Sequence, residues 1–307
     1  MVKLQFVVLL SAVRFRLAAP KKDWRGMYKI NIYLTVLFSI IVFSILIYFL
    51  PGSGVNSLMI AITSVASFLF GIFLAFAIDH RQNRFNGIRS ALRKDDALLL
   101  SIYKNSAVFG EKIQSEVKQL IDEYLIASID YKLLDYYKSH ANFNKLYDYF
   151  NDVKPANEVQ IAVYSEIINE IKESSEKKKE INYLLNDRIE SYEWSSLFSL
   201  GLIIMIALFV MNNDFLLYKF IVVLLGASIV LLLMILKQFD SLNWKEQSWI
   251  WQPLTELFLE LDLVPYIPQP VLASHRSLLQ KGITYRVAIY PNPYPDFKNK
   301  KIEIISN

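Results

Sequence analysis

Residues 57–78, SLMIAITSVASFLFGIFLAFAI, restrict most strongly what this chain can fold into. The stretch contains no charge and no proline, and an α-helix needs roughly 20 such residues to cross the hydrocarbon core of a bilayer. Similar apolar runs lie at residues 30–50, 195–211 and 215–236. Because 54% of the residues are hydrophobic and the excess sits in these runs, we expect a polytopic membrane protein rather than one large soluble core.

Basic residues flank the apolar runs on one side. Four lysines and arginines lie between residues 21 and 29, and a second basic cluster follows residue 79, whereas the intervening PGSG turn at residues 51–54 is uncharged. The positive-inside rule therefore places both clusters, and both termini, in the cytoplasm.

The absence of cysteine and the compact loops favour a bacterial inner membrane. Residues 1–19 are interpreted as an interfacial segment, with a signal peptide as the alternative.

The fold class predicted from this pattern is an all-α polytopic membrane protein. It has four transmembrane helices, a long helical cytoplasmic insertion and a small C-terminal cytoplasmic tail containing a β-hairpin. The expected segments are an N-terminal interfacial or cytoplasmic segment (1–29), transmembrane helices 1–2 (30–79), a helical cytoplasmic domain (80–194), transmembrane helices 3–4 (195–236) and the tail (237–307).

The cytoplasmic insertion has the apolar spacing of amphipathic helices. One helix is expected from residue 113 onward and a second, uninterrupted one over residues 156–194. The run ESSEKKKE at residues 173–180 is interpreted as a solvated helical stretch. The adjacent pair Asp95 and Asp96 is interpreted in the same way, because neighbouring carboxylates on a helix point in different directions.

The tail combines an aromatic segment with a proline-rich one. Residues 244–261 hold three tryptophans in an amphipathic pattern, which either lies in the headgroup region or packs on the cytoplasmic helices. Three prolines over residues 265–270 predict irregular structure there. Alternating apolar residues at 283–290 and 301–305 predict the hairpin.

The sequence contains little that indicates catalysis. No cysteine is present, and His80, His140 and His275 lie in three separate regions without a partner at metal-ligand spacing. Phosphate-binding, dinucleotide-binding and hydrolase motifs are missing from the sequence. We therefore expect no enzyme, no cofactor and no metal site. A formal charge of only +4 gives no reason to expect a nucleic-acid partner.

Two stripes with four-residue spacing run along residues 57–78. The first stripe is small and suits helix packing or a pore face: Ser67, Gly71 and Ala75. The second stripe is large and apolar: Phe68, Ile72 and Phe76. Around a symmetry axis the second stripe would form stacked apolar rings, which can gate a pore by excluding water.

The order of these features resembles the bestrophin and bestrophin-like membrane proteins. The resemblance covers residues 25–265 and rests on two stretches, FLFGIFLAFAIDHRQNRFNGIRSALRKDDALLLSIYKNS and LKQFDSLNWKEQSWIWQPL. It implies a pentameric, chloride-permeable pore lined by the second span, with a neck of three apolar side chains. The neck is assigned to Phe68, Ile72 and Phe76, although Ile62, Ala66 and Phe70 have the same spacing. The acidic run that binds calcium in bestrophins is missing after the fourth span, so calcium gating is not expected.

Two functions follow as hypotheses. The first is a homo-oligomeric channel for small inorganic anions, in contact with membrane lipid. Its cytoplasmic mouth would be ringed by basic side chains, which favour anions: Arg81, Arg84, Arg89 and Arg93. The positive-inside rule explains these arginines equally well without a pore. The second hypothesis is a non-conducting scaffold or signalling protein, whose cytoplasmic helices and tryptophan-rich tail bind a partner.

Overall fold

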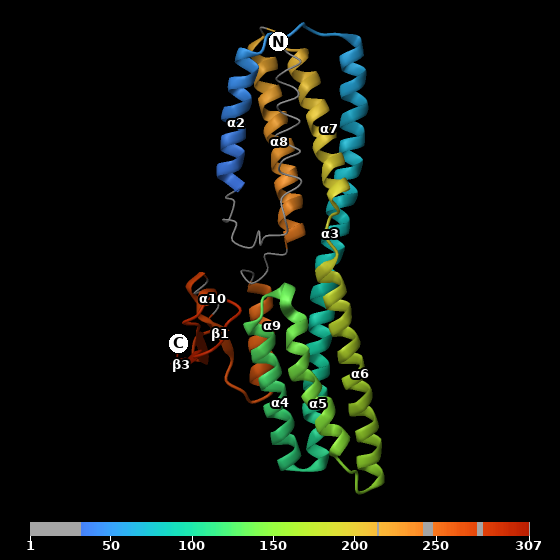
Figure 1. The fold of residues 1–307 in the computed structure, drawn as a ribbon, viewed down its shortest axis with the longest axis vertical. Coiled ribbons are helices and arrows are strands. Elements are labelled where there is room, and N and C mark those ends of the chain that lie inside the picture. The colour runs from blue at the N-terminus through green and yellow to red at the C-terminus, as the bar shows by residue number, and fades with distance from the viewer. Residues whose placement is uncertain (1–31, 214, 242–247, 275–278, 307) are drawn as a thin grey trace. The chain divides into compact units, whose positions relative to one another are not determined.

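The structure is a computed structural model that describes residues 32–213, 215–241, 248–274 and 279–306. It is mostly helical, with a small sheet near the C-terminus (Figure 1). Within the described residues, four helices are long and apolar enough to cross a membrane. The predicted fold class is therefore confirmed. The expected N-terminal segment at residues 1–29 lies outside the described residues.

The chain divides into two compact units, which are described separately. The first comprises residues 1–63 and 203–234, and the second residues 64–202 and 235–307. Across the four candidate spans only 11–33% of each apolar window is buried within the chain. Most of this apolar surface is therefore left for lipid or for other subunits. The helices concerned are α2 (Ile32–Phe49), α3 (Ser57–Ser106), α7 (Ser191–Val210) and α8 (Leu216–Ser241).

In the first unit, the turn after α2 is bound to the turn after α7. The side-chain amide of Asn212 donates hydrogen bonds to the carbonyls of Ile47 (2.9 Å) and Leu50 (3.1 Å). Gly52 lies so close that a Cβ atom there would be 2.1 Å from the carbonyl oxygen of Asn212. A side chain at residue 52 would therefore separate the two turns, which explains why glycine occupies this position.

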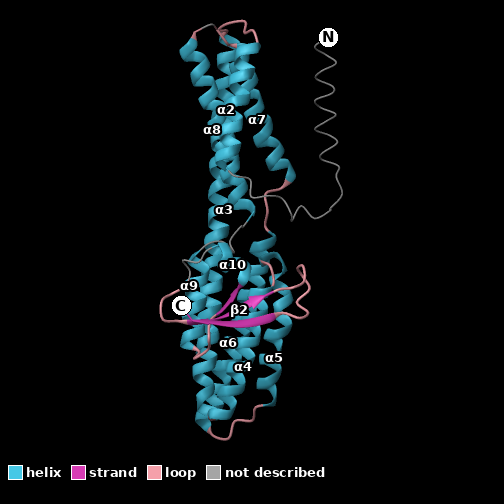
Figure 2. Ribbon diagram, turned by 90° about the vertical axis from the view of Figure 1, so that its left-hand side faces the viewer, coloured by secondary structure: helices cyan, strands magenta, loops and turns pink. Residues whose placement is uncertain are grey.

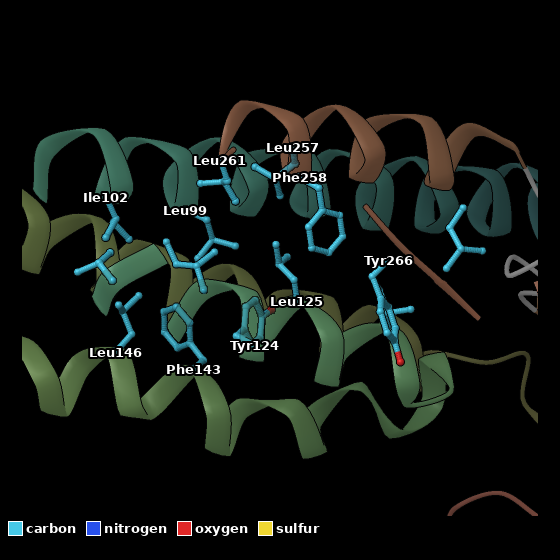
Figure 3. Packing of buried hydrophobic residues seen from close by; sticks show 14 of the residues in the cluster. Leu99, Ile102, Tyr124, Leu125, Phe143, Leu146, Leu257, Phe258, Leu261 and Tyr266 are labelled. Atoms are coloured by element: carbon cyan, nitrogen blue, oxygen red, sulfur yellow. The ribbon is translucent and has the colours of Figure 1, made fainter. Parts of the chain in front are cut away.

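In the second unit, four helices run side by side as a bundle (Figure 1). The helices are the polar C-terminal part of α3, α4 (Glu111–Asp130), α5 (His140–Asp152) and α6 (Glu158–Asn186), with short 3-10 segments η2 (Ala107–Phe109) and η3 (Leu133–Ser139). Most of their buried apolar residues belong to one core, part of which is shown in Figure 3. A second, smaller cluster packs Ile88 and Ala91 of α3 against Ile181 and Leu185 of α6. Asn157 caps the N-terminus of α6 by accepting a hydrogen bond from the backbone N–H of Gln160 at 2.8 Å.

The expected continuous helix over residues 156–194 is wrong. The structure ends α6 at Asn186 and begins α7 at Ser191. Asp187, which follows α6, has the extended backbone values φ −71° and ψ 99°. Neither proline nor glycine marks this break in the sequence. Its cause is a set of tertiary contacts, described below.

The tail packs against the bundle and forms a three-stranded sheet in the order β1–β2–β3 (Figure 2). Strands β2 and β3 are antiparallel, so the predicted hairpin is confirmed. Strand β1 is parallel to β2 and was not predicted. The elements are α9 (Ser248–Glu260), β1 (Tyr266–Pro268), α10 (Gln269–Ser274), β2 (Thr284–Ile289) and β3 (Lys301–Ser306).

Irregular structure over residues 265–270 was the wrong expectation. Pro268 ends the short strand β1, and Pro270 lies in the first turn of α10, where a helix does not need the missing N–H. Pro265 precedes β1, and its carbonyl accepts a hydrogen bond from the N–H of Arg286 at 2.7 Å. The prolines therefore occupy positions that tolerate them.

Charged side chains fix the sheet to α4. The guanidinium of Arg286 on β2 donates to both carboxylate oxygens of Asp122 on α4, at 2.6 and 2.7 Å. Such bidentate pairs are among the stronger ion pairs in proteins. At the last residue of α4, Asp130 accepts hydrogen bonds from three tail residues: Tyr266 (2.5 Å), Tyr290 (2.6 Å) and Lys300 (2.6 Å).

Candidate functional site

Helix α3 is the element on which the candidate functional residues lie. It runs for 50 residues without a break, a length of about 75 Å. Along its apolar part, one face is buried against the chain: Ala66, Phe70 and Leu74. Two members of the alternative neck register, Ala66 and Phe70, are therefore covered within the chain, while Ile62 is 37% exposed.

The predicted neck residues lie on an uncovered face of α3. Phe68 is 68% exposed, Ile72 38% and Phe76 70%. Large apolar side chains without neighbours in their own chain need lipid or another subunit to cover them. This placement is compatible with a neck, and the neck assignment stays a prediction.

The small stripe of α3 is also uncovered within the chain. Ser67, Gly71 and Ala75 are all exposed. A Cβ atom added at Gly71 would meet nothing within 4 Å. Among the described residues, no neighbour therefore requires a glycine at this position, and a small residue here suits close approach by another helix.

Two of the four arginines predicted to ring a cytoplasmic mouth are buried and bind the C-terminus of α6. Arg84 donates to the carbonyls of Leu184 (Nε, 2.6 Å) and Leu185 (2.8 Å). Arg81 donates to the carbonyl of Asp187 at 2.6 Å. The last carbonyls of a helix have no partner within it and attract cations. These two arginines therefore terminate α6.

Asp240, at the end of α8, contacts both Arg81 and Arg84. We call these three side chains the arginine clamp. The carboxylate of Asp240 lies 3.6 Å from Arg81 and 3.8 Å from Arg84, and its backbone carbonyl accepts a further hydrogen bond from Arg84 at 3.2 Å. The same carboxylate accepts the backbone N–H of Ile189 at 3.0 Å. The clamp thus joins α3, the α6–α7 break and α8, and it explains why the helix stops at residue 186.

The other two arginines lie farther along α3. Arg89 is half-buried and Arg93 is exposed. Both line a pocket together with Asp96 and Trp251. The assignment of all four arginines to a pore mouth stays a prediction. For Arg81 and Arg84, the structure shows a different role within the chain.

Comparison with known proteins gives one result for this arrangement. The family model for the bestrophin-like domain matches residues 32–241, about two thirds of the chain. The chain belongs to the bestrophin-like family. It is accordingly a channel-like integral membrane protein. No curated protein and no solved structure matches it.

The match to the bestrophin-like domain ends at residue 241, where α8 ends. The tail beyond it packs on the bundle over residues 251–261, whereas the side chains of residues 244–250, including Trp244 and Trp249, lie outside those that the structure describes. The described side chains that face the bundle are buried: Trp251, Leu257, Phe258 and Leu261. Figure 3 shows Leu257, Phe258 and Leu261 of α9 pointing toward Leu99 and Leu125. Over residues 251–261, the partner-binding hypothesis therefore lacks the exposed aromatic surface on which it depends.

Sequence reasoning missed a buried ion pair between α3 and α6. The Nζ of Lys178 lies 2.5 and 2.7 Å from the two carboxylate oxygens of Asp95, and both side chains are almost completely buried. Ser174 donates to Asp95 at 2.5 Å, and Tyr124 donates to it at 3.2 Å. The expectation of solvated faces is therefore wrong for Asp95 and, within residues 173–180, for Ser174 and Lys178.

Aromatic rings enclose the ammonium group of this pair. Lys178 Nζ lies 3.9 Å from the ring centre of Phe143 and 4.4 Å from that of Tyr124, a distance at which the ring faces attract a cation. Burial lowers the pKa of Lys178, and the nearby Asp95 opposes that shift. Burial and the same carboxylate raise the pKa of Tyr124 well above its usual value. Tyr124 therefore stays a neutral donor.

The histidines do not come together. His80 accepts a hydrogen bond from Arg81 at 2.8 Å. His140 packs edge-on against Tyr136, and its pKa is lowered by burial and by Lys178. His275 lies outside the described residues. Within the part of the chain that the structure describes, no group of three His, Asp or Glu side chains could hold a metal ion.

Proposed function

We propose that the chain is one subunit of a homo-oligomeric, anion-permeable channel whose pore is lined by α3. Family membership supports a channel-like membrane protein. The observation that carries the proposal is the uncovered apolar stripe on α3, made of Phe68, Ile72 and Phe76. The described part of the chain leaves Phe68 and Phe76 largely exposed and Ile72 partly exposed. A ring of α3 helices around a common axis would enclose them and form a hydrophobic neck.

A pentamer is the assembly proposed for this channel, because the resemblance to bestrophins implies five subunits. Particle imaging of the detergent-purified chain tests the assembly directly. We expect a five-fold ring with α3 next to the axis. A monomer, or a dimer without an axial path, would remove the proposed mechanism.

The neck is tested by ion flux in liposomes that contain the purified chain. Replacing Phe68, Ile72 and Phe76 by alanine shortens the side chains that would close the pore, so we expect chloride flux to change several-fold. Phe220→Ala is the matched control, because Phe220 is a 59% exposed aromatic residue on α8. Unchanged flux in all three α3 variants would contradict the neck assignment.

Anion selectivity is a separate part of the proposal and needs its own measurement. We expect the reversal potential in a potassium chloride gradient to follow chloride rather than potassium. Because Arg81 and Arg84 bind carbonyl groups within the chain, we propose no direct contact between them and the permeating ion. A reversal potential that follows potassium would show that the channel is cation-selective.

A further inference from the structure

A pocket in the second unit lies between α3, α4, η3 and α9. Its cavity volume is about 70 Å³, and a single water needs roughly 10–15 Å³ of such volume. The pocket therefore holds about five waters, which occupy roughly 150 Å³ in the liquid, or one small organic molecule of that volume. Leu125, Ile129, Trp251 and Leu254 contribute to walls that are mostly apolar.

One carboxylate in this pocket is left without a partner. Asp95 and Asp96 both line the pocket, but they differ in their contacts. Asp95 is bound by Lys178, Ser174 and Tyr124. Asp96 is half-buried and receives neither a hydrogen bond nor an ion pair from any residue in the described ranges. Burial and the neighbouring Asp95 raise the pKa of Asp96 to about 8, and the charge of Lys178, which is bound to Asp95, opposes this shift only in part.

One guanidinium group in the same pocket is also left without a partner. Arg93 lies three residues before Asp96 on α3 and lines the same pocket. Opposite charges at this spacing on a helix commonly pair. Here no ion pair joins Arg93 to Asp96, nor to any other described residue. The pocket therefore presents the Asp96 carboxyl group, which can give up its proton when a cation binds, and the exposed Arg93 guanidinium beside apolar walls, with Arg89 also in its lining.

We propose that this pocket binds a short aliphatic α-amino acid. The ammonium group of the ligand would bind Asp96, its carboxylate would bind Arg93, and its side chain would lie against Trp251 and Leu254. A purely anionic ligand would leave the half-buried Asp96 unpaired, which is unfavourable for a carboxylate shielded from water. A purely cationic ligand would make no use of the exposed Arg93 at the rim of the pocket. An aliphatic amino acid satisfies both groups and fits the volume.

The tail would take part in this binding, because Trp251, Pro253 and Leu254 of α9 form one wall of the pocket. These residues lie beyond the family match at residues 32–241. The site would therefore combine the shared domain with a segment outside it. The proposal concerns binding and does not depend on whether the chain conducts ions.

The test is calorimetric titration of the detergent-purified full chain with three probes of nearly equal size. L-valine carries both charges, 3-methylbutanoate lacks the ammonium group and isobutylamine lacks the carboxylate. We expect saturable binding of L-valine, and at least tenfold weaker binding of the other two. Equal binding of either analogue, or no saturable binding of L-valine, would overturn the proposal.

Two substitutions and two matched controls locate the site. Asp96→Asn and Arg93→Gln should each weaken L-valine binding at least tenfold. Asp152→Asn, at an exposed position on α5, and Lys94→Gln, next to Arg93 but paired with Glu173, should leave it unchanged. Retained affinity in both pocket variants would place any valine binding elsewhere and refute the assignment.

The pH dependence gives a further readout. Because the ammonium group needs an ionised carboxylate, L-valine affinity in the original chain should rise as the pH increases from 6.5 to 8.5. Binding at pH 7 should release protons to the buffer, since the pKa of Asp96 is raised to about 8. Affinity that is independent of pH, with no proton release, would contradict contact with Asp96.

Discussion

At the scale of single residues, the interior of the bundle depends on one charged contact. Asp95 and Lys178 have both lost their hydration, and each is stabilised mainly by the other. A buried pair of this kind adds little net stability, but removing one member leaves an uncompensated charge. The surrounding Phe143 and Tyr124 rings attract a cation and cannot stabilise a lone carboxylate.

Lys178→Met should destabilise the chain by about 3–5 kcal/mol, because it leaves Asp95 charged and buried. Chemical unfolding of the purified chain, followed by tryptophan fluorescence, measures this loss. The double variant Lys178→Met with Asp95→Asn should recover part of it. Lys179→Met, at an exposed neighbouring position, is the control and should change stability by less than about 0.5 kcal/mol. An equal loss in the double variant would show that the cost is one of packing.

Asp96 should make the stability of the chain depend on pH. Its pKa is raised from 3.8 to about 8, so between these values the folded chain holds a proton that the unfolded chain has lost. The free energy of unfolding therefore falls as pH rises through this window, by at most about 1.4 kcal/mol per pH unit, and levels off above it.

Asp96→Asn removes this dependence. We expect a higher melting temperature than in the original chain at pH 8, and a smaller difference at pH 5. Differential scanning fluorimetry across that range provides the comparison, with Asp152→Asn as the control. Parallel pH profiles for the original chain and Asp96→Asn would show that the Asp96 carboxyl titrates normally.

The buried pair could have been predicted from the spacing of apolar residues alone. Buried positions on α3 run through Ile88, Ala91, Asp95, Leu99 and Ile102. Those on α6 run through Ile171, Ser174, Lys178, Ile181 and Leu185. Each charged residue therefore stands at a position where the helical period demands burial. Interpreting residues 95–96 and 173–180 by their charged composition alone missed this helical periodicity.

At the scale of elements, the break between α6 and α7 depends on contacts from elsewhere in the chain. Arg81, Arg84 and Asp240 hold the backbone of residues 184–189. The local sequence favours continuing the helix, so the break could not be predicted without knowing that three distant side chains converge there. In contrast, the hairpin was predictable, because its alternating pattern is local.

Asp240→Ala should loosen this break without unfolding the bundle. The backbone N–H of Ile189 loses its acceptor, and the two arginines lose their carboxylate. Hydrogen exchange measured by mass spectrometry should therefore be at least tenfold faster in peptides covering residues 187–190. Asp152→Ala serves as the control. Unchanged exchange in this segment would show that the arginines alone hold the break.

At the scale of the whole molecule, the four apolar runs made the fold class predictable, because few structures can bury such lengths. The same reasoning could not identify strand β1, which is three residues long and pairs with a strand about 20 residues later. Nor could it reveal how much apolar surface of the spans one chain leaves uncovered. That surface is a property of the assembled fold.

Gly71→Leu should impair the assembly of subunits without impairing the folding of a single subunit. Because a Cβ atom at Gly71 meets nothing within 4 Å, the subunit should fold as before, with unchanged helical circular dichroism. Contacts between subunits along the small stripe should be lost, which light scattering on the eluting complex would detect as a lower mass. Gly52→Ala is the contrasting variant, since its Cβ would collide with Asn212 and lower the melting temperature.

The unbroken course of α3 has a mechanical consequence. Phe68 and Asp96 lie on one helix, 28 residues and about 42 Å apart, without a proline or a change of helix type between them. A straight, uninterrupted helix is stiff. A rotation about its long axis at one point is therefore passed along the helix with little bending. A small turn of α3 at the level of Asp96 would therefore reorient the aromatic side chains at its far end.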